Sequence, residues 1–292
     1  MTAKKDNLLL DFGSGSTRLY KDGKLVSSAK SFFSEFQANS YHKFHLVDRG
    51  TITHFDFATN FLNKFLEKQI SSGLISSRFK GYYLAPEGLT QVEELIIKKV
   101  LSSLQLGSWK ILSKKNIIKT KAGLVIDVGF DSTEVVLGMG TGEIKAKTIN
   151  FGSRFFTQTI RKVVRDNHQL EVSWLGAEKI KKELAGDDFL LSVNKSKQKI
   201  TVRGKDIYTF VPKTIVVEAS IFQKPLLERV EEIFEEIKLF FSKISTNLLM
   251  NSIEKGLELW GDGSKMAGVD SFFAQKLQTK VKVTTASYEV QK

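Results

Sequence analysis

Short apolar runs near the start of the chain predict a β-hairpin. Leu8–Leu10 form an apolar strand, the small residues of 11–17 form a loop, and an alternating run from Arg18 to Tyr20 forms the return strand. The Asp22–Gly23 step then leads into a third strand at 24–27. We therefore expect strands that turn back on one another.

Apolar residues at helical spacing follow this hairpin. They predict helices over 57–70 and 89–104, separated by a strand around 81–84. Glu93 stands three residues after Thr90 at the start of the second helix. We interpret Glu93 as the acid of a capping box rather than as a catalytic group.

The hairpin pattern then repeats in the second half of the chain. A strand at 124–126, a turn at 127–133 and a return strand at 134–137 follow the same order, and both turns read Asp-x-Gly-x-x-x-Thr. A repeat of a whole hairpin unit predicts two related domains that face one another. We place the first domain at 1–121 and the second at 122–292.

The rest of the second domain is predicted to be mostly helical, with a small α/β subdomain at about 170–222. No linker rich in proline, glycine or serine divides the chain. The expected elements are a hairpin through 140–142, helices at 155–166 and 176–185, short strands at 189–193, 199–203 and 206–217, a long amphipathic helix at 224–247, a strand at 257–260 and a helix at 265–277.

The composition is that of a globular protein of 292 residues, with 41% hydrophobic and 26% charged residues. Because the chain has no cysteine, disulfides, cysteine-ligated metals and cysteine nucleophiles are excluded. Its four histidines do not have the spacing of a zinc-binding His-Glu-x-x-His helix. Since no apolar run approaches the ~18 residues that a membrane span needs, we expect a cytoplasmic protein.

Lysine and arginine exceed aspartate and glutamate by 12, which favours polyanionic partners. Basic runs lie at 109–121 and 195–205, whereas 228–236 is acidic. Aromatic residues are not interleaved with the basic runs, which argues against nucleic acid as a partner. We expect at most peripheral contact with anionic membrane or an acidic protein. The Phe-rich stretch 31–36 is the candidate for membrane insertion, and its alternative role is to pack the edge of the first domain.

Three loops of small residues, 11–17, 127–133 and 261–264, each follow a predicted strand. Small residues let backbone N–H groups approach a phosphate chain closely, and the start of the helix predicted after the third loop favours an anion. Because a hydrated Mg²⁺ prefers oxygen ligands, we expect Asp11 and Asp127, at the heads of the first two loops, to hold it through water.

Around these loops the sequence reads DFGSGSTRLY at 11–20, LVIDVGFDSTEVVLG at 124–138 and GLELWGDGSKMAGVD at 256–270. In this order the motifs resemble those of the actin-like ATPase superfamily, most closely the bacterial MreB actins, with FtsA, PilM and EutJ-like proteins as cousins. The resemblance implies an α/β fold of two actin-like (ribonuclease H-like) lobes with a central nucleotide cleft. Because 27–50 is shorter than the family's usual insertion, we expect the insertion subdomain of the first lobe to be reduced or absent.

The resemblance implies ATP and Mg²⁺ as ligands and assigns contacts to individual residues. Phosphate contacts fall on Gly13, Ser14, Gly15, Ser16, Thr17, Gly129, Ser132 and Thr133, adenosine contacts on Glu178, Lys181, Gly261, Gly263 and Ser264, and metal contacts on Asp11 and Asp127. The alternative role of Thr17 and Thr133 is to cap their turns.

The sequence departs from the family in its loops and at the position of the catalytic acid. Phe130 and Asp131 replace two glycines of the second loop, and Asp262 adds a negative charge to the third. Ser113 and Lys114 stand where MreB proteins carry the glutamate that activates water. Neither accepts a proton at neutral pH as a carboxylate does, so we expect very slow or absent hydrolysis.

We expect a divergent MreB-like bacterial actin that binds ATP and assembles into cytoskeletal filaments. The alternatives are a non-filamentous adaptor or chaperone-like scaffold of the PilM or EutJ kind, and a small-molecule kinase, for which neither an acceptor pocket nor an aspartate base is identifiable. No catalytic residue is assigned, and Glu87 and Asp131 are the first candidates for a substitute base. Lys114 and Lys115 either contact phosphate or are solvated at the end of a strand.

Overall fold

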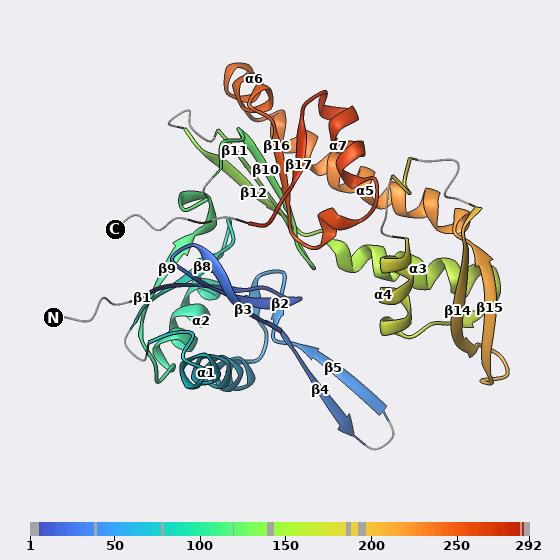
Figure 1. Ribbon diagram of the computed structural model, residues 1–292, viewed down its shortest axis with the longest axis horizontal. Helices are drawn as coiled ribbons and strands as arrows, with labels where there is room; N and C mark the ends of the chain where they lie inside the picture. The colour runs from blue at the N-terminus through green and yellow to red at the C-terminus, as the bar shows by residue number, and fades with distance from the viewer. Residues whose placement is uncertain are drawn as a thin grey trace. The chain divides into compact units, whose positions relative to one another are not determined.

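The computed structural model describes residues 6–37, 40–76, 79–118, 120–138, 143–184, 188–191, 197–286 and 288, with side chains for all of these except 6 and 32–44. The chain divides into two compact units. Unit 1 comprises Met1–Thr120, Lys145–Thr148 and Ala286–Lys292, and unit 2 comprises Lys121–Ile144 and Ile149–Thr285. Each unit contains a five-stranded sheet and several helices (Figure 1), so the predicted α/β class is confirmed.

The sheet of unit 1 has the strand order β3-β2-β1-β8-β9. Neighbouring strands are antiparallel from β1 to β3, whereas β8 runs parallel to β1 and β9 parallel to β8. Leu8, Leu10 and Leu19 are fully buried, so the apolar run that predicted the hairpin lies in the core of this unit. The strands are β1 (Asp6–Phe12), β2 (Ser16–Lys21), β3 (Lys24–Lys30), β8 (Phe79–Ala85) and β9 (Ser108–Ser113).

Helices α1 (Phe55–Ser71) and α2 (Gln91–Ser102) contribute their apolar stripes to the same core. The side chain of Thr90 accepts a hydrogen bond from the backbone N–H of Glu93 (3.2 Å), and the Glu93 carboxylate accepts one from the backbone N–H of Thr90 (2.7 Å). The capping box predicted at the start of α2 is therefore confirmed.

The segment between β3 and α1 holds two short antiparallel pairs. Strand β4 (Phe32–Gln37) pairs with β5 (Ser40–His45), and β6 (Val47–Asp48) pairs with β7 (Thr51–Ile52). This agrees with a reduced insertion in the first lobe. The side chains of the Phe-rich stretch from Phe32 onward lie outside the described ones, so its role in membrane insertion stays a prediction.

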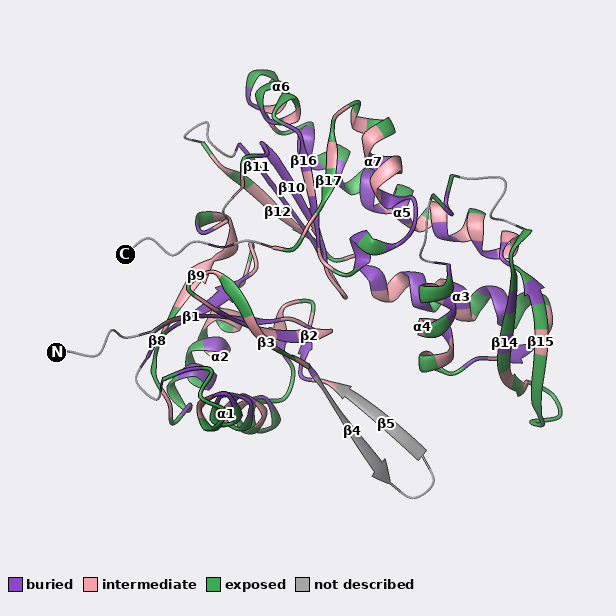
Figure 2. Cartoon of the chain, viewed as in Figure 1, coloured by how far each residue is buried: buried purple, intermediate pink, exposed green. Residues whose placement is uncertain are grey.

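The second five-stranded sheet, which belongs to unit 2 except for Lys145–Thr148 of β12, repeats the strand arrangement of the first in the order β12-β11-β10-β16-β17. Asp127 lies opposite Glu134 in the hairpin of β10 and β11, at the same place in the motif where Asp11 lies opposite Arg18 in unit 1. Figure 2 shows that β10, β11 and β16 are largely buried. The strands are β10 (Leu124–Val128), β11 (Thr133–Leu137), β12 (Lys145–Ile149), β16 (Leu257–Trp260) and β17 (Val281–Val283).

Helices surround this second core, and a small three-stranded sheet adjoins it. The small sheet has the order β13-β14-β15 and packs with helix α4. Within the described ranges, no helix is long and apolar enough to cross a membrane. The elements are β13 (Leu170–Glu171), β14 (Lys199–Asp206), β15 (Pro212–Glu218), α3 (Ser153–His168), α4 (Trp174–Glu183), α5 (Ser220–Phe241), α6 (Thr246–Glu254) and α7 (Val269–Leu277).

The long helix predicted at 224–247 is wrong at both ends. The apolar stripe placed its start at about 224, but α5 begins at Ser220 and contains Pro225 within its second turn. At the other end, the N–H groups of Lys243 and Ile244 bond to carbonyls three residues earlier. This tightening ends α5 at Phe241, and α6 follows as a separate helix.

Three further elements differ from the prediction. The strand predicted at 206–217 is wrong over its first half, because β14 ends at Asp206, a turn follows, and β15 begins at Pro212. Residues 188–191 form a turn closed by a hydrogen bond from Leu191 N–H to the Asp188 carbonyl (3.0 Å), so the strand predicted at 189–193 is wrong over its described part. Gly268, at φ +89°, separates a 3₁₀ turn at Gly263–Lys265 from α7, which therefore begins later than predicted. The hairpin predicted through 140–142 lies outside the described residues.

Candidate functional site

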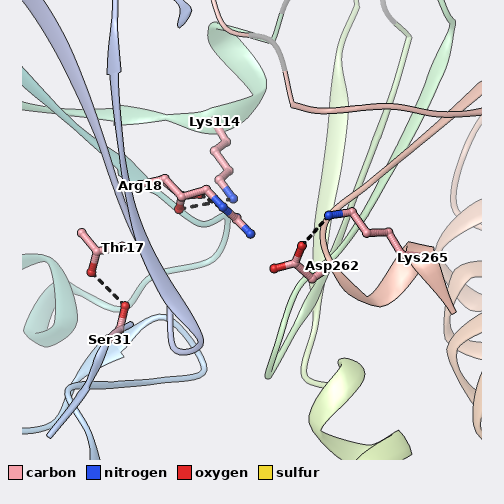
Figure 3. A network of polar contacts seen from close by, with 7 residues as sticks. Thr17, Arg18, Ser31, Lys114, Asp262 and Lys265 are labelled. Atoms are coloured by element: carbon pink, nitrogen blue, oxygen red, sulfur yellow. Dashed lines mark hydrogen bonds and ion pairs between the residues drawn. The ribbon is translucent and has the colours of Figure 1, made fainter. Parts of the chain in front are cut away.

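The first small-residue loop of unit 1 is a tight turn between β1 and β2. The backbone N–H of Gly13 donates to the Ser16 carbonyl at 3.2 Å and closes the loop. The hydroxyls of Thr17 and Ser31 share a hydrogen bond of 2.8 Å, and both residues are fully buried (Figure 3). The Thr17 hydroxyl is therefore bonded inside unit 1, and its role toward a phosphate stays a prediction.

Asp11, at the head of this loop, faces two cations. Its carboxylate oxygens lie 3.6 Å from an Arg18 guanidinium nitrogen and 3.8 Å from Lys114 Nζ. The side chains of Asp11 and Lys114 are only 10% and 15% exposed. Burial raises the pKa of the nearby Tyr83, the Asp11 charge raises it further, and the Lys114 charge opposes them. Lys114 is thus not a solvated lysine at the end of a strand.

Ser113 and Lys114, which stand where a water-activating glutamate was expected, contact other side chains of unit 1. The Ser113 hydroxyl donates to Glu87, and Lys115 Nζ forms an ion pair with the other Glu87 oxygen at 2.8 Å. Lys114 follows β9 in a 3₁₀ turn (Lys114–Asn116) and extends toward Asp11. Glu87, a candidate substitute base, is therefore held by two neighbours.

The corresponding loop of unit 2 has the same closing hydrogen bond. The backbone N–H of Gly129 donates to the Ser132 carbonyl at 2.9 Å, and the buried Thr133 hydroxyl donates to the Phe151 carbonyl at 2.7 Å. Arg154 forms an ion pair of 3.0 Å with Asp131, which is 4% exposed. The second candidate base is thus paired with a cation.

The third loop, after β16, lies against the end of β10. Gly261 has φ +84°, and a Cβ there would lie 2.3 Å from the Val128 carbonyl oxygen and 2.6 Å from an Asp127 carboxylate oxygen. A Cβ at Gly263 would lie 2.4 Å from the Val128 side chain. Only glycine permits this approach. Asp262, the added carboxylate, is paired with Lys265 at 2.9 Å (Figure 3).

The two residues predicted to contact the ribose meet between α3 and α4. Lys181 Nζ donates to Glu178 at 2.7 Å and to the Thr157 hydroxyl at 2.8 Å, and that hydroxyl donates to Glu178. Burial lowers the pKa of Lys181, while the charges of Glu178 and Asp262 raise it. Lys181, Glu178 and Thr157 therefore form one hydrogen-bonded group.

The structure thus brings the predicted unit 2 residues together in two groups. Asp127 lies against Gly261 of the third loop, and Lys181 pairs with Glu178. Sequence reasoning missed Arg18 and Thr157. Arg18 had a signal, because alternation in a hairpin places it on the same face as Asp11. Thr157 had none, because its role depends on how α3 packs on α4.

The predicted metal pair is judged by what surrounds each aspartate. At Asp127, Gly261 of the third loop approaches closely, and the adenosine contacts of that loop stay a prediction. Asp11 does not fit a metal ion, because two cations already face its carboxylate. In the described part of the chain, no group of three or more acidic, histidine or cysteine side chains is arranged to hold a metal.

Comparisons with known proteins agree with this architecture. A family model described as MreB/Mbl protein matches residues 44–291. The chain is 24% identical over 245 residues to the cell shape-determining protein Mbl of Bacillus subtilis (strain 168), covering 80% of this chain and 72% of that protein.

Solved structures show the same fold. MreB5 of Spiroplasma citri bound to ADP superposes with a TM-score of 0.83 at 17% identity, covering 96% of this chain and 92% of that one. The MamK double helical filament superposes with a TM-score of 0.73 at 12% identity, covering 96% and 94%. The expected actin-like fold is confirmed. Because the family model covers well over half of its length, this chain belongs to the MreB/Mbl family and is an MreB-like cytoskeletal actin homologue.

Proposed function

We propose that this protein binds an adenine nucleotide and assembles into filaments, with very slow or absent hydrolysis. The observation that carries the proposal is the close approach of Gly261 to Asp127 and Val128, which holds the third loop against the end of β10, beside the head of the second loop. The Spiroplasma citri relative, which is bound to ADP, supports nucleotide binding.

The proposed roles divide by unit. In unit 2, Glu178 and Lys181 bind the ribose, and Gly261, Gly263 and Ser264 present backbone to the adenosine. The phosphates are contacted by the loops that begin at Asp11 and Asp127, through the residues predicted from the motifs. Asp127 is the member of the predicted metal pair that we retain for a water-mediated Mg²⁺, since one carboxylate with phosphates and waters suffices for that ion.

The proposal of slow hydrolysis is supported by the lack of an available carboxylate to activate the attacking water. The stretch 108–118 contains no carboxylate, Glu87 is held by Ser113 and Lys115, and Asp131 is paired with Arg154. Loss of a positioned general base typically reduces a rate about 10²- to 10⁴-fold. Ser113→Glu should raise phosphate release, with Ser108→Glu on the same strand as the control. Phosphate release by the unmodified protein at the rate of Bacillus subtilis Mbl, assayed alongside it, would contradict the proposal.

Self-association is supported by the filament formed by MamK and by one exposed tip of unit 2. Tyr208, Phe210 and Val211, between β14 and β15, are 70%, 65% and 58% exposed. The Asp206 carboxylate accepts hydrogen bonds from the N–H groups of Tyr208 and Thr209 at 3.0 Å, which fixes the turn and lowers the Asp206 pKa. A preformed apolar tip suits contact with a second copy of the chain.

Electron microscopy and sedimentation, with and without ATP, test assembly. We expect Phe210→Ser to reduce the pelleted fraction, whereas Met250→Ser, which changes a 55% exposed side chain on α6, should not. The alternative is a non-filamentous adaptor, which the paired carboxylates Asp11 and Asp131 favour. Unmodified protein that binds nucleotide yet forms no polymer would support this alternative over the filament.

Contact with other partners rests on charge alone. The net charge of +12 supports peripheral contact with anionic lipid or an acidic protein. Such binding should weaken as salt rises, because exposed charges are screened. Vesicle sedimentation that is equally strong for neutral and anionic lipid would contradict it.

A further inference from the structure

Arg18, Lys114 and Asp11 form a compact cationic cluster at the first phosphate loop of unit 1. Two positive side chains lie within 3.8 Å of one carboxylate. Arg18 is fixed by its place opposite Asp11 in the hairpin, and Lys114 by the 3₁₀ turn that follows β9. These cations are therefore built into two separate elements of one unit.

We propose that Arg18 and Lys114 supply the positive charge that a divalent cation would otherwise bring to this loop, so that the protein binds nucleotide phosphates without requiring Mg²⁺. The proposal rests on the proposed function, because it concerns the same nucleotide. It assigns Arg18 and Lys114 as phosphate-binding residues and Asp11 as the group that positions them.

Electrostatics favour this arrangement over a metal at Asp11. Both oxygens of the Asp11 carboxylate already have a cation within 3.8 Å, so a divalent ion bound there would be repelled by Arg18 and Lys114. A polyphosphate is negatively charged, so both cations attract it. Guanidinium groups bind phosphate oxygens in pairs, and an ammonium group binds them as a point charge.

The burial of the cluster strengthens the argument. Arg18, Lys114 and Asp11 are 25%, 15% and 10% exposed, so bulk water screens them less than it screens a surface pair. Asp11 keeps both cations oriented in the absence of ligand. Phosphate oxygens that approach Arg18 and Lys114 then find donors already in place, which reduces the ordering needed on binding.

Calorimetric titration with ADP, in excess Mg²⁺ and in EDTA, tests the proposal on the full chain. We expect dissociation constants that agree within about threefold between the two conditions. Lys114→Gln and Arg18→Gln should each weaken binding in EDTA about tenfold or more, whereas Lys114→Arg should retain it. Lys110→Gln, which removes an exposed lysine from β9, the strand that precedes Lys114, is the matched control.

A triple variant controls for the possibility that a single substitution weakens binding only by unfolding the protein. Because removing a cation leaves Asp11 buried and less compensated, the triple variant Asp11→Asn, Arg18→Gln, Lys114→Gln removes all three charges together. We expect it to fold, as judged by circular dichroism, and to lose binding in EDTA. Equal ADP affinity of the folded triple variant and the unmodified protein in EDTA would overturn the assignment.

The outcomes separate this inference from the proposed function. Binding of ADP in Mg²⁺ but not in EDTA would overturn the inference and leave nucleotide binding intact. Absence of ADP and ATP binding in both conditions, on folded protein, would instead overturn the proposed function itself. Binding in both conditions that depends on Arg18 and Lys114 supports both.

Discussion

The two hairpins that open the units have the same backbone geometry, but the residue opposite the aspartate has opposite charge in the two. Asp11 lies opposite Arg18 in unit 1, and Asp127 lies opposite Glu134 in unit 2. Each turn closes with the same hydrogen bond, from the glycine two residues after the aspartate to a carbonyl three residues further on. The residue across the hairpin from the aspartate is therefore basic in unit 1 and acidic in unit 2.

This difference shows that a shared motif does not fix a shared role. In unit 1 the carboxylate is compensated by Arg18 and Lys114. In unit 2 Glu134 is buried beside Asp127, and the third loop approaches the same carboxylate through Gly261. The repeat is one of backbone geometry, whereas the chemistry is set separately in each unit.

The largest expected effect is a loss of folding stability when a glycine of a closely packed loop is replaced. Gly261→Ala places a Cβ 2.3 Å from the Val128 carbonyl at a left-handed φ, so we expect it to lower the free energy of unfolding by about 2–4 kcal/mol. Gly13→Ala in unit 1 meets its nearest atom at 3.2 Å and should cost less than about 1 kcal/mol. Urea denaturation followed by circular dichroism measures both, and equal costs would contradict the contrast between the units.

A second variant converts the first hairpin into the charge pattern of the second. Arg18→Glu places two acids opposite each other, as in unit 2, so ADP affinity in EDTA should fall about tenfold or more, which corresponds to about 1.4 kcal/mol. Mg²⁺ should restore part of that loss. Arg203→Glu, on the exposed face of β14, carries the same change of charge and should leave calorimetric affinity unchanged. If Arg18→Glu leaves ADP affinity in EDTA unchanged, the charge opposite Asp11 does not affect binding, and the proposed difference between the hairpins is wrong.

Much of this architecture follows from local patterns in the sequence. Both hairpins, the Thr90 capping box and the central strands are set by alternation, turn residues and capping spacing, which act between neighbours along the chain. Arg18 opposite Asp11 was readable from the same alternation. Lys114 was not, because it reaches Asp11 only through the order β1-β8-β9, which brings together residues more than a hundred positions apart.

The start of one helix in each unit gives a smaller contrast. Helix α2 begins with the reciprocal pair Thr90 and Glu93, whereas Ser173 caps α4 through a single hydrogen bond to Gly176 N–H. Glu93→Gln should cost about 1 kcal/mol at pH 7, measured by thermal unfolding. Ser173→Ala should cost a similar amount or less, and should do so at every pH.

The pH dependence distinguishes the two caps. Hydrogen bonds from Thr51, and then from Thr90, lower the pKa of Glu93 in the folded state below its unfolded value of 4.5. Its stabilisation is therefore complete above the unfolded pKa and is lost as the pH falls through the folded pKa. The difference between Glu93→Gln and the unmodified protein should shrink in acid. A difference that is constant from pH 7 down to acid would show that the carboxylate charge is not what stabilises the cap.

The most direct test of the central claim compares Asp11→Asn with Asp127→Asn in ADP titrations with Mg²⁺ and with EDTA. The account predicts that Asp11→Asn binds ADP in EDTA at least as tightly as the unmodified protein. The amide oxygen of the substituted side chain still accepts hydrogen bonds from Arg18 and Lys114 and keeps them oriented, while the competing negative charge is gone. Asp127→Asn should lose whatever increment Mg²⁺ provides. A tenfold or larger loss for Asp11→Asn that appears only in Mg²⁺ would show that Asp11 holds the metal and would contradict the account.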